Sequence, residues 1–281
     1  MGRHRARAAA LLTAAVLAVT GGLTGAQASA SPSGAPVPAD RGCAAPTVVL
    51  VHGAWADSSN WDGVVALLQN HGYPVRVFPT PLRSLAGDSR ALRDYLAAVT
   101  GPVVLVGHSY GGAVVTDAAV GVRSVRALVY VDAFAPDTGE SVLQLASAAS
   151  VLAAPDPTTV FDFIPASLPP TPATDLYVRP AFFPAAFAGD IPARQAAVLA
   201  VTGRPVTYGA LTEASTQPAW RTIPSWYEVG TRDRVIPQAQ QLIMARRAHS
   251  HIVFAPTAHL PMVSRPAQVD RLIESAARAT R

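Results

Sequence analysis

The stretch Val103-Val104-Leu105-Val106-Gly107-His108-Ser109-Tyr110-Gly111-Gly112 carries the clearest structural signal in the chain. Its first four residues form an apolar, β-branched run that predicts a buried strand over 103–106. The run leads directly into a Gly-x-Ser-x-Gly turn, and a helix rich in small residues is predicted over 112–120. A strand, a sharp turn and a helix in this order are typical of a nucleophile elbow, in which the strained turn exposes the hydroxyl of Ser109. A plain glycine-rich turn is the alternative interpretation.

Strand and helix patterns alternate on both sides of this stretch. A continuous apolar run at Thr47–Val51 predicts another strand that is buried on both faces. The remaining apolar patterns predict strands at 74–78, 127–131, 226–229 and 252–254, and helices at 60–70, 88–99, 238–248 and 267–279. Such alternation predicts an α/β fold with a doubly wound, mainly parallel sheet and right-handed crossovers.

Residues 136–222 interrupt the alternation. The segment holds about half of the chain's 25 prolines, and its helical patterns are short. A low-complexity or disordered segment is one interpretation, but several aromatic side chains are available for burial: Phe161, Phe163, Tyr177, Phe182, Phe183, Phe187, Tyr208 and Trp220. We therefore expect a small, mainly helical cap, inserted into a core domain formed by residues 47–135 and 223–281.

The composition is that of a globular protein, because 50% of the residues are hydrophobic and only 14% are charged. Most of the formal net charge of +4 comes from the first thirty residues, which contain Arg3, Arg5 and Arg7 and no acidic residue. The residues after Ala30 include 19 Arg and 18 Asp plus Glu, and the whole chain has no Lys. The charge therefore gives no reason to expect a nucleic-acid partner or stable association with a membrane.

Residues 1–30 have the parts of a secretory signal peptide. Basic residues precede an apolar run over 8–19, and small residues follow, so that cleavage is expected after Ala28 or Ala30. The run is shorter than the ~20 residues that a transmembrane helix needs. We expect a secreted protein, with residues 31–46 as a linker. The single cysteine, Cys43, lies in that linker and allows no intrachain disulfide.

A serine nucleophile needs a histidine base, and the chain has seven histidines. His259 follows the predicted strand at 252–254, at the sheet edge where the reactive loops of open α/β folds lie. His108 and His52 are expected to have structural roles beside the turn and the first loop. His249 and His251 have no third ligand nearby in the sequence, so a metal site is not expected.

Two aspartates compete for the acid that would orient the histidine. Asp233, in Gly230-Thr231-Arg232-Asp233, follows the strand at 226–229, whereas Asp132 ends the strand at 127–131. The order Ser109, Asp233, His259 matches the nucleophile, acid and base order of α/β-hydrolases, which favours Asp233. Asp132 is the alternative candidate for this acid.

Acyl transfer also requires N–H donors for the developing oxyanion. The backbone N–H of Tyr110, directly after the nucleophile, is one candidate. The loop His52-Gly53-Ala54-Trp55 after the first strand offers the second, for which we select the N–H of Ala54. Gly53 allows the backbone of this loop to approach closely, and Trp55 is a candidate for substrate binding.

With these motifs the chain resembles the α/β-hydrolase superfamily over residues 47–279, and within it the esterase and hydroxynitrile-lyase branch, which includes plant methylesterases and many bacterial esterases. The resemblance implies a six-stranded core, a helical cap over the site and no cofactor. Lyases of that branch have a threonine and a lysine at positions held here by Gly53 and Leu260. This departure disfavours lyase chemistry.

The expected function is therefore that of a secreted serine carboxylesterase that forms an acyl-enzyme with small to medium apolar esters or lactones. The alternatives are a lactonase, a C–C bond hydrolase or lyase that uses the same triad, and a non-catalytic binding protein with a relic triad.

Overall fold

A six-stranded sheet forms the centre of the computed structural model, which describes residues 45–280. All of its strands run parallel, in the order β2-β1-β3-β4-β8-β9. Their bounds are Thr47–Val51 (β1), Val75–Phe78 (β2), Val103–Ser109 (β3), Val125–Ala133 (β4), Ser225–Gly230 (β8) and His251–Ala255 (β9). The expected doubly wound parallel sheet is confirmed. The predicted signal peptide, its predicted cleavage site, Cys43 and most of the predicted linker lie outside the described residues.

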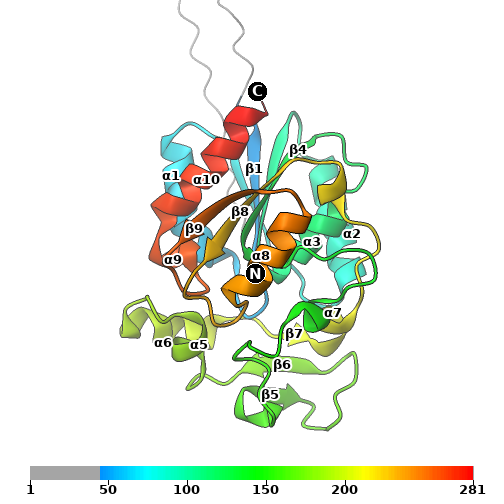
Figure 1. Cartoon of the computed structure of the whole chain (residues 1–281), viewed down its shortest axis with the longest axis vertical. Helices are drawn as coiled ribbons and strands as arrows, with labels where there is room; N and C mark the ends of the chain where they lie inside the picture. The colour runs from blue at the N-terminus through cyan, green and yellow to red at the C-terminus, as the bar shows by residue number, and fades with distance from the viewer. Residues whose placement is uncertain (1–44, 281) are drawn as a thin grey trace, which may run out of the picture. The chain divides into compact units, whose positions relative to one another are not determined.

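Helices cover both faces of this sheet (Figure 1). The helices are α1 (Asp62–Asn70), α2 (Leu85–Ala97), α3 (Tyr110–Ala118), α8 (Gln238–Arg247), α9 (Pro261–Ser264) and α10 (Pro266–Ala279), with a 3-10 turn, η1, at Ser58–Trp61. α1 and α10 pack against each other on one face, whereas α2 and α3 pack against each other on the opposite face.

Local interactions explain why two elements differ in length from the sequence prediction. α2 starts at Leu85, before the predicted residue 88, because the Ser84 side chain accepts a hydrogen bond from the Gly87 N–H at 3.1 Å and caps the helix. β3 continues to Ser109, beyond the predicted residue 106, because its pairing with β4 extends to Ser109 and Ala133. The strand therefore delivers the serine to the end of the sheet.

The segment 136–222, called the insertion below, connects β4 to β8 and lies at the lower end of Figure 1. It contains α4 (Val142–Leu145), α5 (Phe183–Phe187), α6 (Ala193–Thr202) and α7 (Tyr208–Thr212), together with the 3-10 turns η2 (Pro157–Thr159) and η3 (Ala219–Arg221). It also contains a three-stranded antiparallel sheet of β5 (Phe161–Ile164), β6 (Asp175–Val178) and β7 (Val206–Thr207). The expectation of a mainly helical cap missed this sheet. These strands have only two to four residues, too few for a clear alternation in the sequence.

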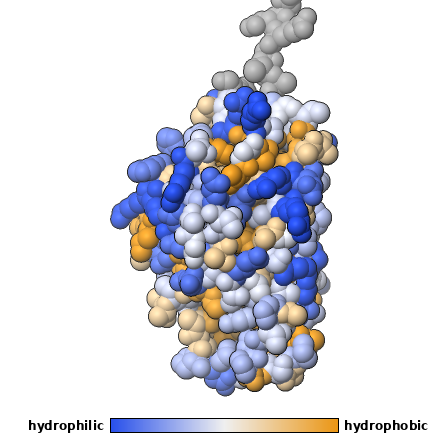
Figure 2. Space-filling model, turned by 90° about the vertical axis from the view of Figure 1, so that its right-hand side faces the viewer, coloured by the Kyte–Doolittle hydropathy of each residue, from blue (hydrophilic) through white to orange (hydrophobic). Residues whose placement is uncertain are grey.

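Burial follows the predicted pattern of the sheet. The side chains of β1 and β3 are buried along their whole length, as expected for strands covered on both faces. β9 forms one edge and leaves Val253 and Phe254 exposed. Figure 2 shows the strongest hydrophilic colour over the upper part of one face and a paler surface with apolar patches over the insertion. No helix among residues 45–280 has the length and apolar character that crossing a membrane requires.

Candidate active site

Ser109 lies in a strained turn between β3 and α3. Its φ of 52° and ψ of −125° are unusual for a residue with a Cβ, and the turn directs the side chain away from the sheet. The turn depends on Gly107, where an added Cβ would lie 2.6 Å from the Gly111 carbonyl oxygen. This geometry is the strand, turn and helix that the sequence predicts.

His259 and Asp233 complete a chain of hydrogen bonds that starts at Ser109. His259 Nε2 is 3.0 Å from Ser109 Oγ, and His259 Nδ1 is 2.8 Å from Asp233 Oδ2. All three side chains are buried. Ser109 ends β3, and Asp233 and His259 lie in the loops that follow β8 and β9, so all three side chains come from the carboxyl ends of the parallel strands. The structure thus brings together the three predicted residues.

Three further donors hold the Asp233 carboxylate. Its Oδ1 accepts hydrogen bonds from the backbone N–H groups of Val235 (2.8 Å) and Ile236 (3.0 Å). Its Oδ2 accepts one from Gln241 Nε2 at 2.9 Å, besides its contact with His259. A carboxylate surrounded by N–H donors acts as an acceptor, so His259 carries its proton on Nδ1. His259 Nε2 is then free to accept the Ser109 proton.

Asp132, the rival acid, occupies a different place. Its Oδ1 accepts a hydrogen bond from the Gly230 N–H at 2.6 Å, and its buried Oδ2 has no hydrogen-bond partner. Burial, with the neighbouring carboxyls of Asp233 and Glu228, raises the pKa of Asp132 well above its usual value. The structure places Asp233, and not Asp132, in hydrogen-bond contact with His259.

The first loop lies directly against Ser109. A Cβ added to Gly53 would lie 2.7 Å from Ser109 Cβ, so only glycine allows this approach. Ala54 and Tyr110 line the same cavity as Ser109. Tyr110 is the first residue of α3, where a backbone N–H has no acceptor within the helix. Both residues of the predicted donor pair therefore line the cavity together with Ser109.

Trp55 reaches from the same loop into the insertion. Its indole N–H donates a hydrogen bond to the Leu176 carbonyl at 2.8 Å. Its ring stacks on Phe161 with a centroid distance of 5.3 Å and meets the edge of Phe187 at 5.9 Å. Trp55 is thus a wall of the cavity, as its predicted role in substrate binding requires.

His52 and His108 have the structural positions that the sequence predicts. His52 accepts a hydrogen bond from the Thr80 N–H at 3.0 Å, and burial lowers its pKa to about 4, so that it is neutral at pH 7. His108 Nε2 is 2.8 Å from the His259 carbonyl oxygen, and burial holds the pKa of His108 well below its ordinary value. Because a carbonyl only accepts, His108 donates this bond and fixes the backbone of His259.

Sequence reasoning missed two residues that support the site. Gln241, on α8, holds Asp233 as described above. Asp190, in the insertion, accepts hydrogen bonds from the Ala258 N–H at 3.1 Å and from the Ser264 hydroxyl at 2.8 Å, on both sides of His259. No motif marks either residue, because their roles depend on how separate elements pack.

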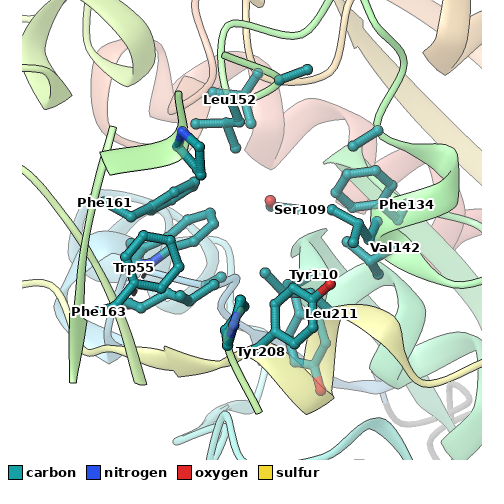
Figure 3. A pocket seen from close by; sticks show the side chains of 18 residues that line it. Trp55, Ser109, Tyr110, Phe134, Val142, Leu152, Phe161, Phe163, Tyr208 and Leu211 are labelled. Carbon is teal, nitrogen blue, oxygen red and sulfur yellow. Dashed lines mark hydrogen bonds between the residues drawn. The ribbon is translucent and has the colours of Figure 1, made fainter. Parts of the chain in front are cut away.

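An apolar cavity of about 310 Å³ opens above Ser109. In Figure 3 the serine hydroxyl points into it, between Trp55 and Phe161 on one side and Phe134 and Val142 on the other. Most of the lining residues come from the insertion, and none of the lining residues in the described part of the chain is charged.

Among residues 45–280, two groups of three side chains have the donor atoms of a metal site. One group consists of the exposed His71, the buried Asp270 and the partly buried Glu274. The other consists of Asp132, Asp233 and His259, with donor atoms within 4.8 Å of one another. In the second group, hydrogen bonds already engage both carboxylate oxygens of Asp233 and the Nδ1 atom of His259.

The sequence model of the Alpha/beta hydrolase family matches residues 48–272. The chain belongs to the α/β-hydrolase family. The match spans the sheet, the insertion and all of the predicted site residues, in agreement with the fold of this α/β hydrolase.

Two characterised proteins resemble the hydrolase in sequence. A carbendazim hydrolyzing esterase from Nocardioides sp. is 36% identical over 113 residues, which cover 34% of this chain and 46% of that protein. The hydrolase thus aligns with about half the length of that relative. The α/β hydrolase nvfD from Aspergillus novofumigatus is 26% identical over 256 residues, covering 83% of this chain and 96% of that protein.

Solved structures with the same fold include two hydrolases and an esterase. An extracellular α/β-hydrolase from a Paenibacillus species has a TM-score of 0.70 at 22% identity, covering 83% of this chain and 99% of its own. Polyneuridine aldehyde esterase has a TM-score of 0.70 at 18% identity, covering 82% and 98%. A pyrethroid hydrolase from Sphingobium faniae has a TM-score of 0.66 at 22% identity, covering 83% and 98%.

Proposed function

We propose that this α/β hydrolase is a serine carboxylesterase that acts on small, uncharged, apolar esters. The observation that carries the proposal is the hydrogen-bonded chain Ser109–His259–Asp233 at the floor of an apolar cavity. Esterases among the relatives and structural neighbours support the same reaction class.

In the proposed reaction His259 Nε2 accepts the proton of Ser109 Oγ as the oxygen attacks the ester carbonyl. The imidazolium that forms is stabilised by the Asp233 carboxylate, which also keeps the ring in its productive tautomer. His259 then gives the proton to the leaving alcohol, and an acyl-enzyme remains on Ser109. Water, deprotonated by the same histidine, hydrolyses this intermediate and releases the acid.

The negative charge of each tetrahedral intermediate develops on the former carbonyl oxygen. The N–H groups of Ala54 and Tyr110 are the proposed donors to this oxyanion, because both residues lie beside Ser109 in the cavity wall. Gly53 supports this arrangement, because it allows the loop that carries Ala54 to approach Ser109 closely.

The cavity itself supports the substrate class. Its volume of about 310 Å³ is at the lower end of the range for small-molecule sites. Its aromatic and aliphatic walls offer no ion-pair partner to a carboxylate or an ammonium group. Uncharged apolar esters, including lactones, therefore fit better than charged ones.

Turnover of a p-nitrophenyl ester series and of a lactone panel tests the proposal. The wild type is expected to hydrolyse short esters, and Ser109→Ala to lose nearly all activity, at least about 10³-fold, while its circular dichroism spectrum stays unchanged. A fluorophosphonate probe should label Ser109 in the wild type and nothing in the variant. Absence of both turnover and labelling in the wild type would favour a binding protein with a relic triad.

We also propose that the enzyme is secreted, because residues 1–30 have the composition of a signal peptide. N-terminal sequencing of protein recovered from the culture medium should begin at Ser29 or Ser31. An intact N-terminus on protein retained in the cells would contradict the proposal.

A further inference from the structure

A second hollow lies next to the active cavity, on the surface of the insertion. It has a volume of about 530 Å³ and is lined mainly by apolar side chains, among them Ile164, Tyr177, Phe183 and Ala200. We call it the outer groove. Trp55 is the only residue in the described part of the chain that lines both the active cavity and the outer groove.

The β5–β6 hairpin explains why the two spaces are separate. Phe161, Phe163 and Leu176 line the active cavity, whereas Ile164 and Tyr177 line the outer groove. In the register of the hairpin, alternate residues point to opposite faces, and the face with Ile164 and Tyr177 borders on the outer groove alone. The opposite face borders on the active cavity except at Val178, the last residue of β6, which lines the outer groove. The wall between the active cavity and the outer groove, called the partition below, thus consists of the hairpin and of Trp55, which borders on both spaces.

Trp55 is held firmly in this position. The hydrogen bond of its indole to the Leu176 carbonyl and its stacking on Phe161 fix the ring against the hairpin. Its backbone, with a φ of 54°, lies so close to Gly203 that a Cβ on this glycine would collide with the Trp55 carbonyl. Because both its indole ring and its backbone are held in place, Trp55 forms a rigid wall.

We propose that Trp55 sets the upper size limit of the substrate, an inference that rests on the proposed esterase function. The indole closes the active cavity, so esters that fit within it are accepted and longer or bulkier ones are rejected. The outer groove is apolar and wide enough to hold an alkyl or aryl extension, with Ile164 54% and Tyr177 41% exposed. Removal of the indole would join the two spaces and admit such an extension.

The test compares kcat/KM for p-nitrophenyl butyrate and p-nitrophenyl octanoate. In Trp55→Ala, the ratio of octanoate to butyrate should rise about tenfold over the wild type, because the added methylenes gain an apolar site. Using the ratio removes any uniform loss that arises from disturbing the neighbouring Ala54 N–H. Equal ratios in the two enzymes would overturn the proposal.

Two further variants separate an opened partition from a merely enlarged cavity. Phe163→Ala removes an aromatic ring that lines the active cavity alone, and it should change the ratio much less than Trp55→Ala. Ala200→Phe fills the outer groove, and it should leave the wild-type ratio unchanged but reverse most of the gain in the Trp55→Ala background. A gain that survives Ala200→Phe would show that the octanoate does not use the outer groove and would contradict the proposal.

Trp55→Leu provides the same comparison if Trp55→Ala does not fold. Binding of the two intact esters to Ser109→Ala proteins, with and without Trp55→Ala, gives a readout that needs no turnover. A wild type that is inactive on all esters but whose Ser109→Ala form shows the Trp55-dependent change in binding would contradict the esterase function alone. If the wild type is active, but wild type and Trp55→Ala show the same octanoate-to-butyrate ratio in both turnover and binding, the result would contradict the role of Trp55 and leave the esterase function intact.

Discussion

Asp132 and Asp233 lie close to the same histidine but differ in what surrounds them. Asp233 accepts hydrogen bonds from three N–H donors in addition to its contact with His259, whereas Asp132 accepts a single one and leaves an oxygen unpartnered. Two buried carboxyls so close together are most stable with one of them protonated. The raised pKa of Asp132, caused by burial and by the Asp233 carboxyl, identifies Asp132 as the neutral partner.

Exchanging each aspartate for asparagine distinguishes their roles. Asp233→Asn should lower kcat/KM by roughly 10⁴-fold, because the amide favours the wrong tautomer of His259. Asp132→Asn should stay within about threefold of the wild type, since a neutral amide can replace a protonated carboxyl. Steady-state kinetics on a short ester checks both values. Loss of activity in Asp132→Asn with a near-normal Asp233→Asn would reverse the assignment.

The sequence predicted the reacting side chains of the candidate site but not their supports. Ser109, Asp233 and His259 follow strands, and parallel strands end at a common edge, so their proximity follows from topology. Gln241 and Asp190 act through the packing of a helix and of the insertion onto loops. Such contacts depend on three-dimensional arrangement and leave no pattern in one sequence.

The β3–α3 turn is the element on which the site geometry depends. Gly107→Ala should destabilise the protein by about 1–3 kcal/mol and lower activity strongly, because the new methyl would overlap the Gly111 carbonyl and displace the turn. Urea denaturation and ester turnover measure the two effects.

Gly189→Ala is the matched control for this substitution. A Cβ at Gly189 meets no atom within 4 Å, and its φ lies outside the left-handed region. The variant should be neutral or slightly more stable than the wild type. Equal effects of the two substitutions would show that the tight turn is not the cause.

At the level of elements, the sequence predicted the core better than the insertion. Long apolar runs such as β1 and β3 identify strands covered on both faces. The insertion instead builds a sheet from the short strands β5, β6 and β7, and their pairing brings together residues as far apart in the sequence as Asp175 and Thr207. Most of the aromatic side chains named in the sequence analysis are buried, as predicted, but Tyr177 is exposed. The aromatic content did not indicate the pairing of the strands.

The stability of the whole molecule should depend on pH through Glu228. This glutamate of β8 is fully buried, and neither of its carboxyl oxygens has a partner. Burial raises its pKa from 4.5 to about 7. Between these two values the folded state binds more protons than the unfolded state, so the free energy of unfolding falls as the pH rises through this range.

Glu228→Gln should remove this part of the pH dependence. Relative to the wild type, the variant should gain on the order of 3 kcal/mol in unfolding free energy between pH 4.5 and pH 8. Urea unfolding of both proteins across this range gives the difference and cancels the contribution of other groups. Parallel curves for the two proteins would contradict the prediction.

Asp190 connects the insertion, which lines most of the active cavity, with the segment that carries His259. A chimera that took its insertion from another hydrolase would lose the acceptor for the Ala258 N–H and the Ser264 hydroxyl. Such a chimera would gain a new pocket, but the backbone on both sides of His259, the proposed base, would be held less firmly. Transfer of specificity by exchange of insertions therefore has to retain an aspartate at this position.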